Sequence, residues 1–231
     1  MQEVIKSITL SLPLRTGTVN CCLIRNDKGY FLIDTGSSNS RKVLEEELAA
    51  AGCAPGYLRL IALTHGDFDH TGNAAYLRGK FNTKIAMHYD DLGMVEYGDM
   101  FWNRKKSNFL IKAAAPRLFG FGKSKRFKPD IFLAEGTDLS EFGFDAKVIE
   151  IPGHSKGSIG FLTAAGDLIG GDLFENVKNP RLNSIMDDPE AAKASIEKLN
   201  GFEIGMVYPG HGRPFTMEEF KKQEFGEEKE N

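Results

Sequence analysis

The sequence Thr64-His65-Gly66-Asp67-Phe68-Asp69-His70 decides how this chain is interpreted. It places two histidines and two aspartates within six residues, directly after the apolar run Leu58–Leu63, which has the length of a strand. Imidazole and carboxylate groups are ligands that zinc, iron and manganese accept, and the cluster contains no cysteine. Because four ligands in six residues cannot all bind one ion without strain, the spacing predicts that they divide between two neighbouring ions.

Other chemistry-bearing side chains also follow predicted strands, most of them beside glycine. They are Asp34 after Tyr30–Ile33, His154 after Ala146–Ile151, Asp172 after Leu168–Gly171 and His211 after Met206–Tyr208. Loops at strand ends bring distant parts of a chain together, so we expect these side chains to converge. Two cations a few ångströms apart need a bridging anion, and Asp172 is the candidate. His88 has no glycine-flanked setting of this kind, and we expect it to be structural.

Short strands alternate with helical patterns, which predicts a layered α/β protein. The predicted strands not yet named are Val19–Arg25, Lys84–His88 and Ser158–Thr163. The predicted helices are Ser40–Ala51, one beginning over Asn73–Leu77, and one that Asp188 caps and that runs to about Leu199. We expect the charged tail Lys221–Asn231 to be frayed.

The composition fits one domain over residues 1–231, with 41% hydrophobic and 26% charged residues. A net charge of −3 gives no overall reason to expect nucleic acid or an anionic membrane as a partner. Met1–Leu14 lacks the features of a signal peptide, and no apolar run is long enough to span a bilayer. Three cysteines without a CxxC pair predict buried, reduced thiols (Cys21, Cys22 and Cys53) and a cytoplasmic protein.

The motif of residues 65–70, HxDxDH, resembles the HxHxDH signature of the metallo-β-lactamase superfamily, with Asp67 in place of the second histidine. The other landmarks of that family follow in order and span residues 34 to 212: Asp34, Gly153-His154, Gly171-Asp172 and Gly210-His211-Gly212. The resemblance implies a four-layer αββα sandwich with a dinuclear site at one edge of its two sheets.

The resemblance also implies a role for each residue of the site. His65, Asp67 and His154 would hold the first metal ion, Asp69, His70 and His211 the second, and Asp172 would bridge them. Asp34 would support the HxDxDH loop through hydrogen bonds; its alternative is an ordinary turn residue. The expected cofactors are two divalent ions. Zinc is expected first, and iron or manganese are the alternatives because the Asp67 carboxylate is a harder ligand than histidine. If Asp67 instead only caps the following helix, one ion alone would be held tightly.

A basic and aromatic insertion is expected at about residues 92–133. Phe101–Pro129 contains nine basic residues, six aromatic residues and no acidic residue, so the rest of the chain carries −12. One interpretation is a lid that contacts an anionic, partly apolar small molecule through Lys123, Lys125 and Arg126. The other is a solvated basic helix that packs its aromatic side chains on the core.

The resemblance to the glyoxalase II-like branch implies a hydrolase in which a metal-bridging hydroxide, oriented by Asp69, cleaves an ester, thioester or lactone. Three alternatives stay open. A phosphodiesterase acting on a nucleotide or phospholipid headgroup would suit the basic segment. An iron-dependent redox enzyme would suit Asp67, although no glycine-rich cofactor loop is present. A non-catalytic binding protein would not need so complete a ligand set. A homodimer is also left open.

Overall fold

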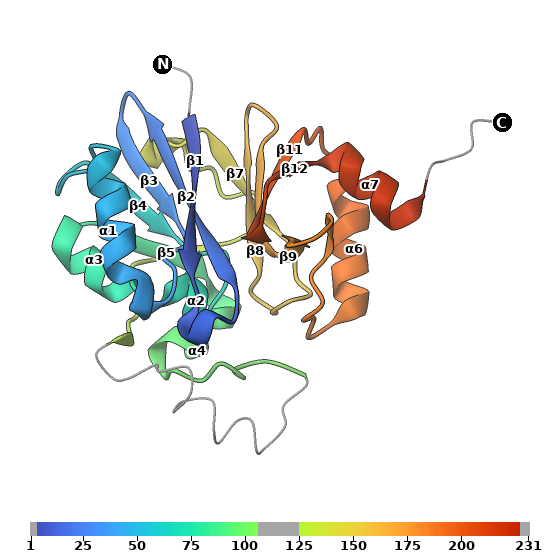
Figure 1. Cartoon of the computed structure of the whole chain (residues 1–231), viewed down its shortest axis with the longest axis horizontal. Helices are drawn as coiled ribbons and strands as arrows, with labels where there is room; N and C mark the ends of the chain where they lie inside the picture. The colour runs from blue at the N-terminus through green and yellow to red at the C-terminus, as the bar shows by residue number, and fades with distance from the viewer. Residues whose placement is uncertain (1–3, 106–124, 227–231) are drawn as a thin grey trace.

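The computed structural model describes residues 4–105 and 125–226, and in it two mixed sheets pack face to face with helices on both outer faces (Figure 1). The first sheet has the order β1-β2-β3-β4-β5-β6. Its strands are β1 (Val4–Ser11), β2 (Thr18–Asn26), β3 (Gly29–Ile33), β4 (Leu58–Ala62), β5 (Lys84–His88) and β6 (Ile131–Leu133). The β1-β2 and β2-β3 pairs are antiparallel, and the strands from β3 to β6 run parallel.

The second sheet has the order β12-β11-β9-β8-β7, with β10 paired to β9. Its strands are β7 (Ala146–Glu150), β8 (Ile159–Thr163), β9 (Leu168–Asn176), β10 (Arg181–Leu182), β11 (Met206–Gly212) and β12 (Phe215–Thr216). The β9-β11 pair is parallel, and its register shifts on both sides of Pro209, after which His211 and Gly212 pair with Glu175 and Asn176. This irregular stretch carries His211.

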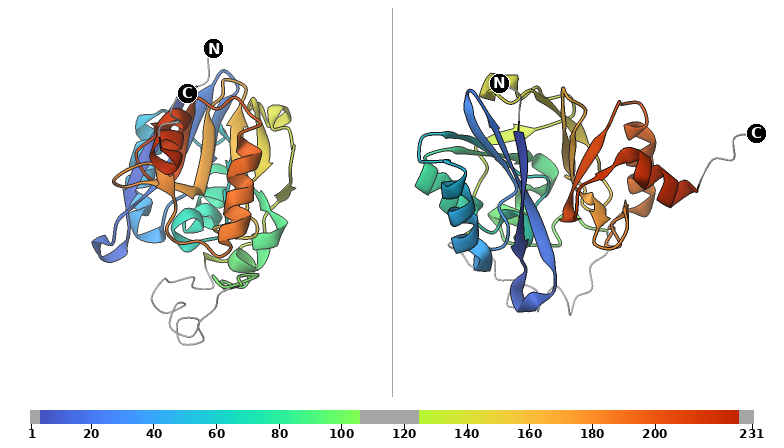
Figure 2. Two further views of the ribbon diagram at one scale, coloured as in Figure 1. Left: turned by 90° about the vertical axis from the view of Figure 1, so that its right-hand side faces the viewer. Right: turned by 45° about the horizontal axis from the view of Figure 1, so that its top comes forward.

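Helices cover the outer face of each sheet. On the first sheet lie α1 (Arg41–Ala50) and α3 (Ala74–Phe81), with the short helices α2 (Phe68–Thr71) and α4 (Leu92–Glu96) at one edge. On the second sheet lie α6 (Pro189–Leu199) and α7 (Met217–Phe225), which face the viewer in the left view of Figure 2. The Asp188 side chain caps α6 by accepting a hydrogen bond from the Ala191 amide at 3.3 Å.

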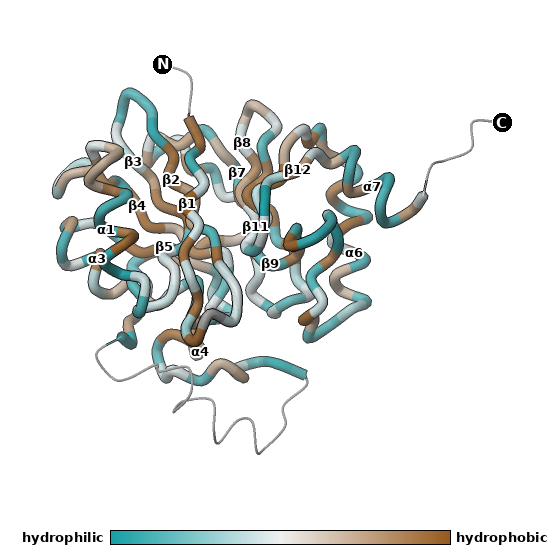
Figure 3. The backbone as a smooth tube through the Cα atoms, in the orientation of Figure 1, coloured by the Kyte–Doolittle hydropathy of each residue, from teal (hydrophilic) through white to brown (hydrophobic). Residues whose placement is uncertain are grey.

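Alternating side chains of the strands fill three apolar layers. In β2, Cys21 and Leu23 pack toward α1 and α3, whereas Cys22 and Ile24 pack between the two sheets. The same alternation in the second sheet separates the inter-sheet layer from the layer beneath α6 and α7. Figure 3 shows the hydrophobic stretches along the strands of both sheets. Three buried layers between four structural layers confirm the predicted αββα sandwich.

Three predictions about element ends are wrong. β9 continues through Asp172 to Asn176, and β11 continues through His211 to Gly212, so these two residues lie inside strands rather than after them. Gly171, at φ +49°, bends β9 without ending it. Lys221 and the residues up to Phe225 belong to α7, which begins with a Thr216–Glu219 capping box and buries Phe220.

All three cysteines are buried and unpaired in the structure. Within residues 4–105 and 125–226, no helix is long and apolar enough to cross a membrane. The central part of the insertion expected at 92–133 lies outside the described residues.

Candidate metal centre

Two groups of histidine and aspartate side chains meet at the sheet edge marked by α2. The first group is His65, His154 and Asp172, and the second group is Asp69, His70 and His211. Within each group the candidate ligand atoms all lie within 4.8 Å of one another. The residues come from the loop after β4, from α2, from the loop after β7, and from β9 and β11, so both sheets contribute. The structure thus brings together the side chains that the sequence singled out.

All four histidines turn their Nε2 atoms toward the centre because their Nδ1 atoms are held from behind. His154 Nδ1 lies 2.7 Å from the carbonyl oxygen of Ile185, and His211 Nδ1 lies 2.6 Å from that of Thr18. A carbonyl oxygen only accepts hydrogen bonds, so each Nδ1 carries the proton and leaves the Nε2 lone pair free. This is the tautomer that a metal-binding imidazole needs.

Asp34 orients the other two histidines. Its Oδ2 atom lies 2.8 Å from His70 Nδ1 and accepts a hydrogen bond of 2.8 Å from the Thr64 hydroxyl, while its Oδ1 accepts from the Thr64 amide at 2.9 Å. Since the Thr64 hydroxyl proton is used on Asp34, the hydroxyl oxygen accepts from His65 Nδ1, 2.9 Å away. Asp34 is buried and has a φ of +60°, a strained conformation for aspartate that these contacts hold in place. Asp34 therefore bonds to Thr64 and His70 in the candidate centre, which an ordinary turn residue would not do.

Asp172 belongs to the first group and also approaches the histidines of the second. Its Oδ1 atom is 3.3 Å from His70 Nε2, and its Oδ2 atom is 3.2 Å from His211 Nε2 and 3.8 Å from His154 Nε2. The backbone of Gly210 passes so close that a Cβ atom there would lie 1.9 Å from Asp172 Oδ1. The Gly210 backbone therefore packs directly against the Asp172 carboxylate, and the bridging role of Asp172 stays a prediction.

Asp67 stands beside the first group. Its Oδ2 atom lies 3.0 Å from His154 Nε2 and 3.7 Å from His65 Nε2. Its Oδ1 atom accepts a hydrogen bond of 2.7 Å from Nη2 of Arg104. Although Asp67 precedes α2, its side chain makes no capping hydrogen bond. The alternative in which it only caps that helix is therefore wrong, and one of its oxygens faces the expected first metal position.

Sequence reasoning missed Asp91, a fully buried carboxylate that joins two ligand loops. Its Oδ2 atom accepts hydrogen bonds from the Gly66 amide at 2.9 Å and from the Ser155 hydroxyl at 2.6 Å. Its Oδ1 atom accepts from the Gly157 amide at 2.9 Å. The loop carrying His65 is thereby tied to the loop carrying His154. Nothing in the local sequence around Asp91 signals this role, because its partners are 25 to 66 residues away.

Carboxylate and imidazole groups lie close together in the candidate centre and shift one another's pKa values. Burial lowers the pKa of His70, but Asp172, Asp34 and Asp69 outweigh it and hold that pKa well above its usual range. The same balance, with Asp172 as the main partner, raises the pKa of His211 to about 9. Burial raises the pKa of Asp172, and His211 and His70 more than reverse this, leaving it well below its usual range. Without a cation, the histidines therefore hold protons more tightly than usual, and Asp172 stays ionised.

The side chains present fit two divalent cations. Among the described residues, His65 Nε2, His70 Nε2 and Asp172 Oδ1 are buried without a hydrogen-bond partner. Buried polar atoms without partners are rare in native proteins, and here they face the centre of the two groups. Nitrogen and oxygen donors in this number suit zinc, iron or manganese.

The metal-free protein is expected to lose stability as the pH rises. The pKa values of His70, His154 and His211 are raised above the ordinary 6.5, so their contribution is complete below pH 6.5 and is lost as the pH rises, in the case of His211 through about pH 9. The lowered pKa of Asp172 acts oppositely, and its contribution is lost as the pH falls below about 3.8. Maximum stability is thus expected between about pH 4 and 6.5.

Thermal unfolding with excess chelator between pH 4 and 9 measures this profile. Added zinc should stabilise the protein strongly at pH 8 and weakly at pH 5, because protons and cations compete for the same atoms. Metal-free stability that rises between pH 6.5 and 9 would contradict the electrostatic picture.

The residues predicted to contact the substrate do not belong to either group of candidate ligands. Lys125 donates a hydrogen bond of 2.7 Å to the Ser38 hydroxyl, and Arg126 is exposed. Lys123 lies outside the described residues. His88 lies outside both groups, with its Nε2 atom 3.2 Å from Glu150. A role for Lys125 and Arg126 in binding substrate stays a prediction.

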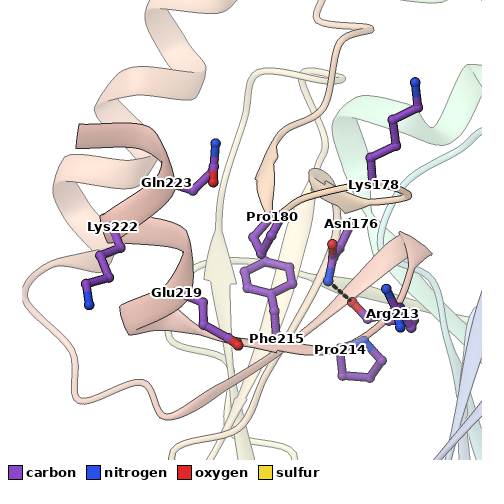
Figure 4. A pocket seen from close by; sticks show the side chains of 9 residues that line it. All are labelled: Asn176, Lys178, Pro180, Arg213, Pro214, Phe215, Glu219, Lys222 and Gln223. Atoms are coloured by element: carbon purple, nitrogen blue, oxygen red, sulfur yellow. Dashed lines mark hydrogen bonds between the residues drawn. The ribbon is translucent and has the colours of Figure 1, made fainter. Parts of the chain in front are cut away.

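A hollow of about 670 Å³ lies beside α7, and none of the candidate ligands line it. Figure 4 shows that the cationic ends of Lys178, Arg213 and Lys222 point apart rather than toward one point. The residues around it are Asn176, Lys178, Pro180, Arg213, Pro214, Phe215, Glu219, Lys222 and Gln223. This hollow is therefore separate from the candidate metal centre.

An αββα sandwich with two histidine–aspartate groups at one sheet edge defines a class of metal-dependent hydrolases. The chain belongs to the metallo-beta-lactamase superfamily, whose family model matches residues 14–211. This confirms the predicted superfamily, fold and enzyme class.

Curated relatives include several hydrolases. The probable metallo-hydrolase YqjP of Bacillus subtilis is 26% identical over 242 residues, covering 93% of this chain and 73% of the relative. The hydroxyacylglutathione hydrolase GloC of Haemophilus influenzae is 31% identical over 157 residues, covering 65% of this chain and 64% of GloC, less than two thirds of its length. The probable metallo-hydrolase MJ0888 of Methanocaldococcus jannaschii is 30% identical and covers 80% of this chain and 84% of the relative.

Solved structures show the same fold. TTHA1623 in a di-iron-bound form matches with a TM-score of 0.69 and 29% identity, over 91% of this chain and 94% of that one. The BLEG-1 B3 metallo-beta-lactamase matches with a TM-score of 0.73 and 21% identity, over 97% of this chain and 100% of that one.

Proposed function

We propose that this protein hydrolyses an ester, thioester or lactone of a small anionic molecule at a two-metal centre. His65, Asp67 and His154 would hold one ion, Asp69, His70 and His211 the other, and Asp172 would contact both. The observation that carries the proposal is the position of Asp172 between two groups whose histidines all present Nε2. The likeness to GloC supports thioesters as the first substrates to test.

Two divalent ions held by these residues would supply Lewis acidity, which would polarise a substrate oxygen and lower the pKa of a water molecule toward neutrality. Zinc is the first candidate because histidine nitrogens outnumber carboxylates among the proposed ligands. The hard Asp67 carboxylate and the likeness to a protein solved in a di-iron-bound form support iron as the alternative.

The chain's own residues supply orientation. Asp69 Oδ2 lies 3.6 Å from His211 Nε2, and its carboxylate is close enough to the centre to orient an attacking water as well as to bind metal. The cysteines near the site are poor nucleophiles, because burial and then Asp34 raise the pKa of the Cys21 thiol well above its usual range. Hydrolysis by activated water therefore fits better than a mechanism with a covalent intermediate.

A substrate panel tests the reaction class. We expect metal-loaded protein to cleave thioester, ester or lactone substrates with a kcat/KM at least about 100-fold above that for a bis-aryl phosphodiester. Chelation should abolish the activity and added metal should restore it. Metal content by mass spectrometry of protein purified without chelator should approach two equivalents per chain.

The second candidate is a phosphodiesterase, which the excess of basic residues in Phe101–Pro129 favours. A preference for the phosphodiester in the same panel would select it. Two equivalents of iron together with substrate-dependent oxygen consumption would instead select a redox enzyme.

A further inference from the structure

A short strap, residues 99–105, follows α4 and crosses beneath the two sheets (Figure 1). On one side Asn103 Nδ2 donates to the carbonyl oxygen of Asp90 at 2.8 Å. On the other side the Lys105 amide donates to Asp187 Oδ2 at 2.9 Å, and the Lys105 ammonium pairs with Asp188. Trp102 lies so close to Gly93 that a Cβ atom there would meet the indole at 2.0 Å. The strap is therefore held on both sides of Arg104.

Arg104 reaches from this strap into the candidate metal centre. Its side chain is 12% exposed, and Nη2 lies 2.7 Å from Asp67 Oδ1. Its Nε atom is buried without a hydrogen-bond partner among the described residues. The other oxygen of Asp67 faces His154 Nε2 at 3.0 Å. One carboxylate is thus shared between a fixed guanidinium and the proposed first metal position.

The charge balance differs between the two positions. At the second position Asp69 adds a negative charge, and no lysine or arginine within residues 4–105 and 125–226 forms an ion pair with it. At the first position Asp67 adds a negative charge that Arg104 offsets in direct contact. Charges this close interact strongly in a partly buried site, and a guanidinium also repels a nearby divalent cation.

We propose that Arg104 is a positioning residue that offsets the charge of Asp67 and limits it to one ligand oxygen. The first metal position then holds its ion more weakly than the second and fills after it. Asp67 with Arg104 thereby has the net charge of a neutral histidine ligand. The proposal rests on the proposed two-metal centre but not on the reaction catalysed there.

Metal titration tests the proposal. Binding of Zn²⁺ to metal-free protein is measured by competition with a chromophoric chelator, without any substrate. We expect Arg104→Met to tighten the weaker site by about tenfold or more, and to change the tighter site by less than about threefold. Arg104→Lys keeps the charge and should stay near wild type. Lys42→Met, at an 89% exposed lysine of α1, is the matched control and should change neither site.

Unchanged or weaker binding in Arg104→Met would overturn the proposal, since a merely structural role predicts loss. If wild type binds one ion, Arg104→Met should bind two, and a single ion in both proteins would overturn the proposal equally. Failure to hydrolyse any substrate would count against the proposed function and leave these titrations unaffected.

Removing both charges of the Asp67–Arg104 pair gives a second test, which does not depend on the folding of Arg104→Met alone. Asp67→His alone leaves Arg104 facing a neutral imidazole and a cation, and should weaken the first site by about tenfold or more. The double variant Asp67→His/Arg104→Met should return that site to within a few-fold of wild type. Wild-type affinity in Asp67→His, or no rescue in a double variant that folds by circular dichroism, would overturn the proposal.

Discussion

Asp172→Ala is expected to lower kcat/KM by a factor on the order of 10³ or more and to reduce metal content below two equivalents per chain. The physical reason is position, because Asp172 approaches histidines of both groups, at 3.8 Å from His154 Nε2 and 3.3 Å from His70 Nε2. In the proposed two-metal centre, its removal would take one ligand from each ion and would leave two cations without the anion that offsets their repulsion.

Steady-state kinetics on the substrate chosen by the panel, combined with metal analysis, measure this effect. Asp27→Ala, in the exposed turn between β2 and β3, is the matched control and should keep wild-type activity. Asp172→Asn keeps the shape of the side chain and removes its charge, so it should lose nearly as much activity. Wild-type activity in Asp172→Ala would exclude the two-metal hydrolase.

Asp91→Ala is expected to lower the free energy of unfolding by about 3 kcal/mol or more. The substitution leaves the Gly66 amide, the Ser155 hydroxyl and the Gly157 amide without their shared acceptor in a buried place. Since these groups belong to the loops of His65 and His154, the first metal site should weaken together with the fold.

Urea unfolding of the metal-free proteins gives the comparison, and metal titration gives the second readout. Asp90→Ala is the matched control, because Asp90 is adjacent in sequence but pairs with the exposed Lys156 at 3.3 Å. That control should stay within about 1 kcal/mol of wild type. An equally small loss in Asp91→Ala would show that the two loops are held by other contacts.

Arg104 and Asp91 have one property in common, which is that each connects the candidate centre to segments outside the motif. Arg104 connects it to the strap at residues 99–105, and Asp91 connects the two ligand loops to the turn after β5. The insertion therefore contacts a candidate metal ligand directly, through Arg104 and Asp67.

Local patterns determined the elements that are regular and short-range. Short runs of apolar, β-branched and aromatic residues located β2 to β5, β7 and β8, and the Asp188-Pro189 signal located the start of α6. The candidate ligands were also readable, because ligand residues beside glycine at strand ends form a pattern within a few positions of the chain. These features depend on neighbours in sequence, and sequence shows neighbours directly.

The tertiary structure decided the remainder. A bulged β9 and a register shift in β11 placed Asp172 and His211 inside strands, although glycine and proline there predicted strand ends. Asp91 and Arg104 received their roles from contacts across 25 to 66 residues of chain. The reason is physical: a buried charge is defined by the groups that surround it in space, and for these two residues every such partner comes from another segment.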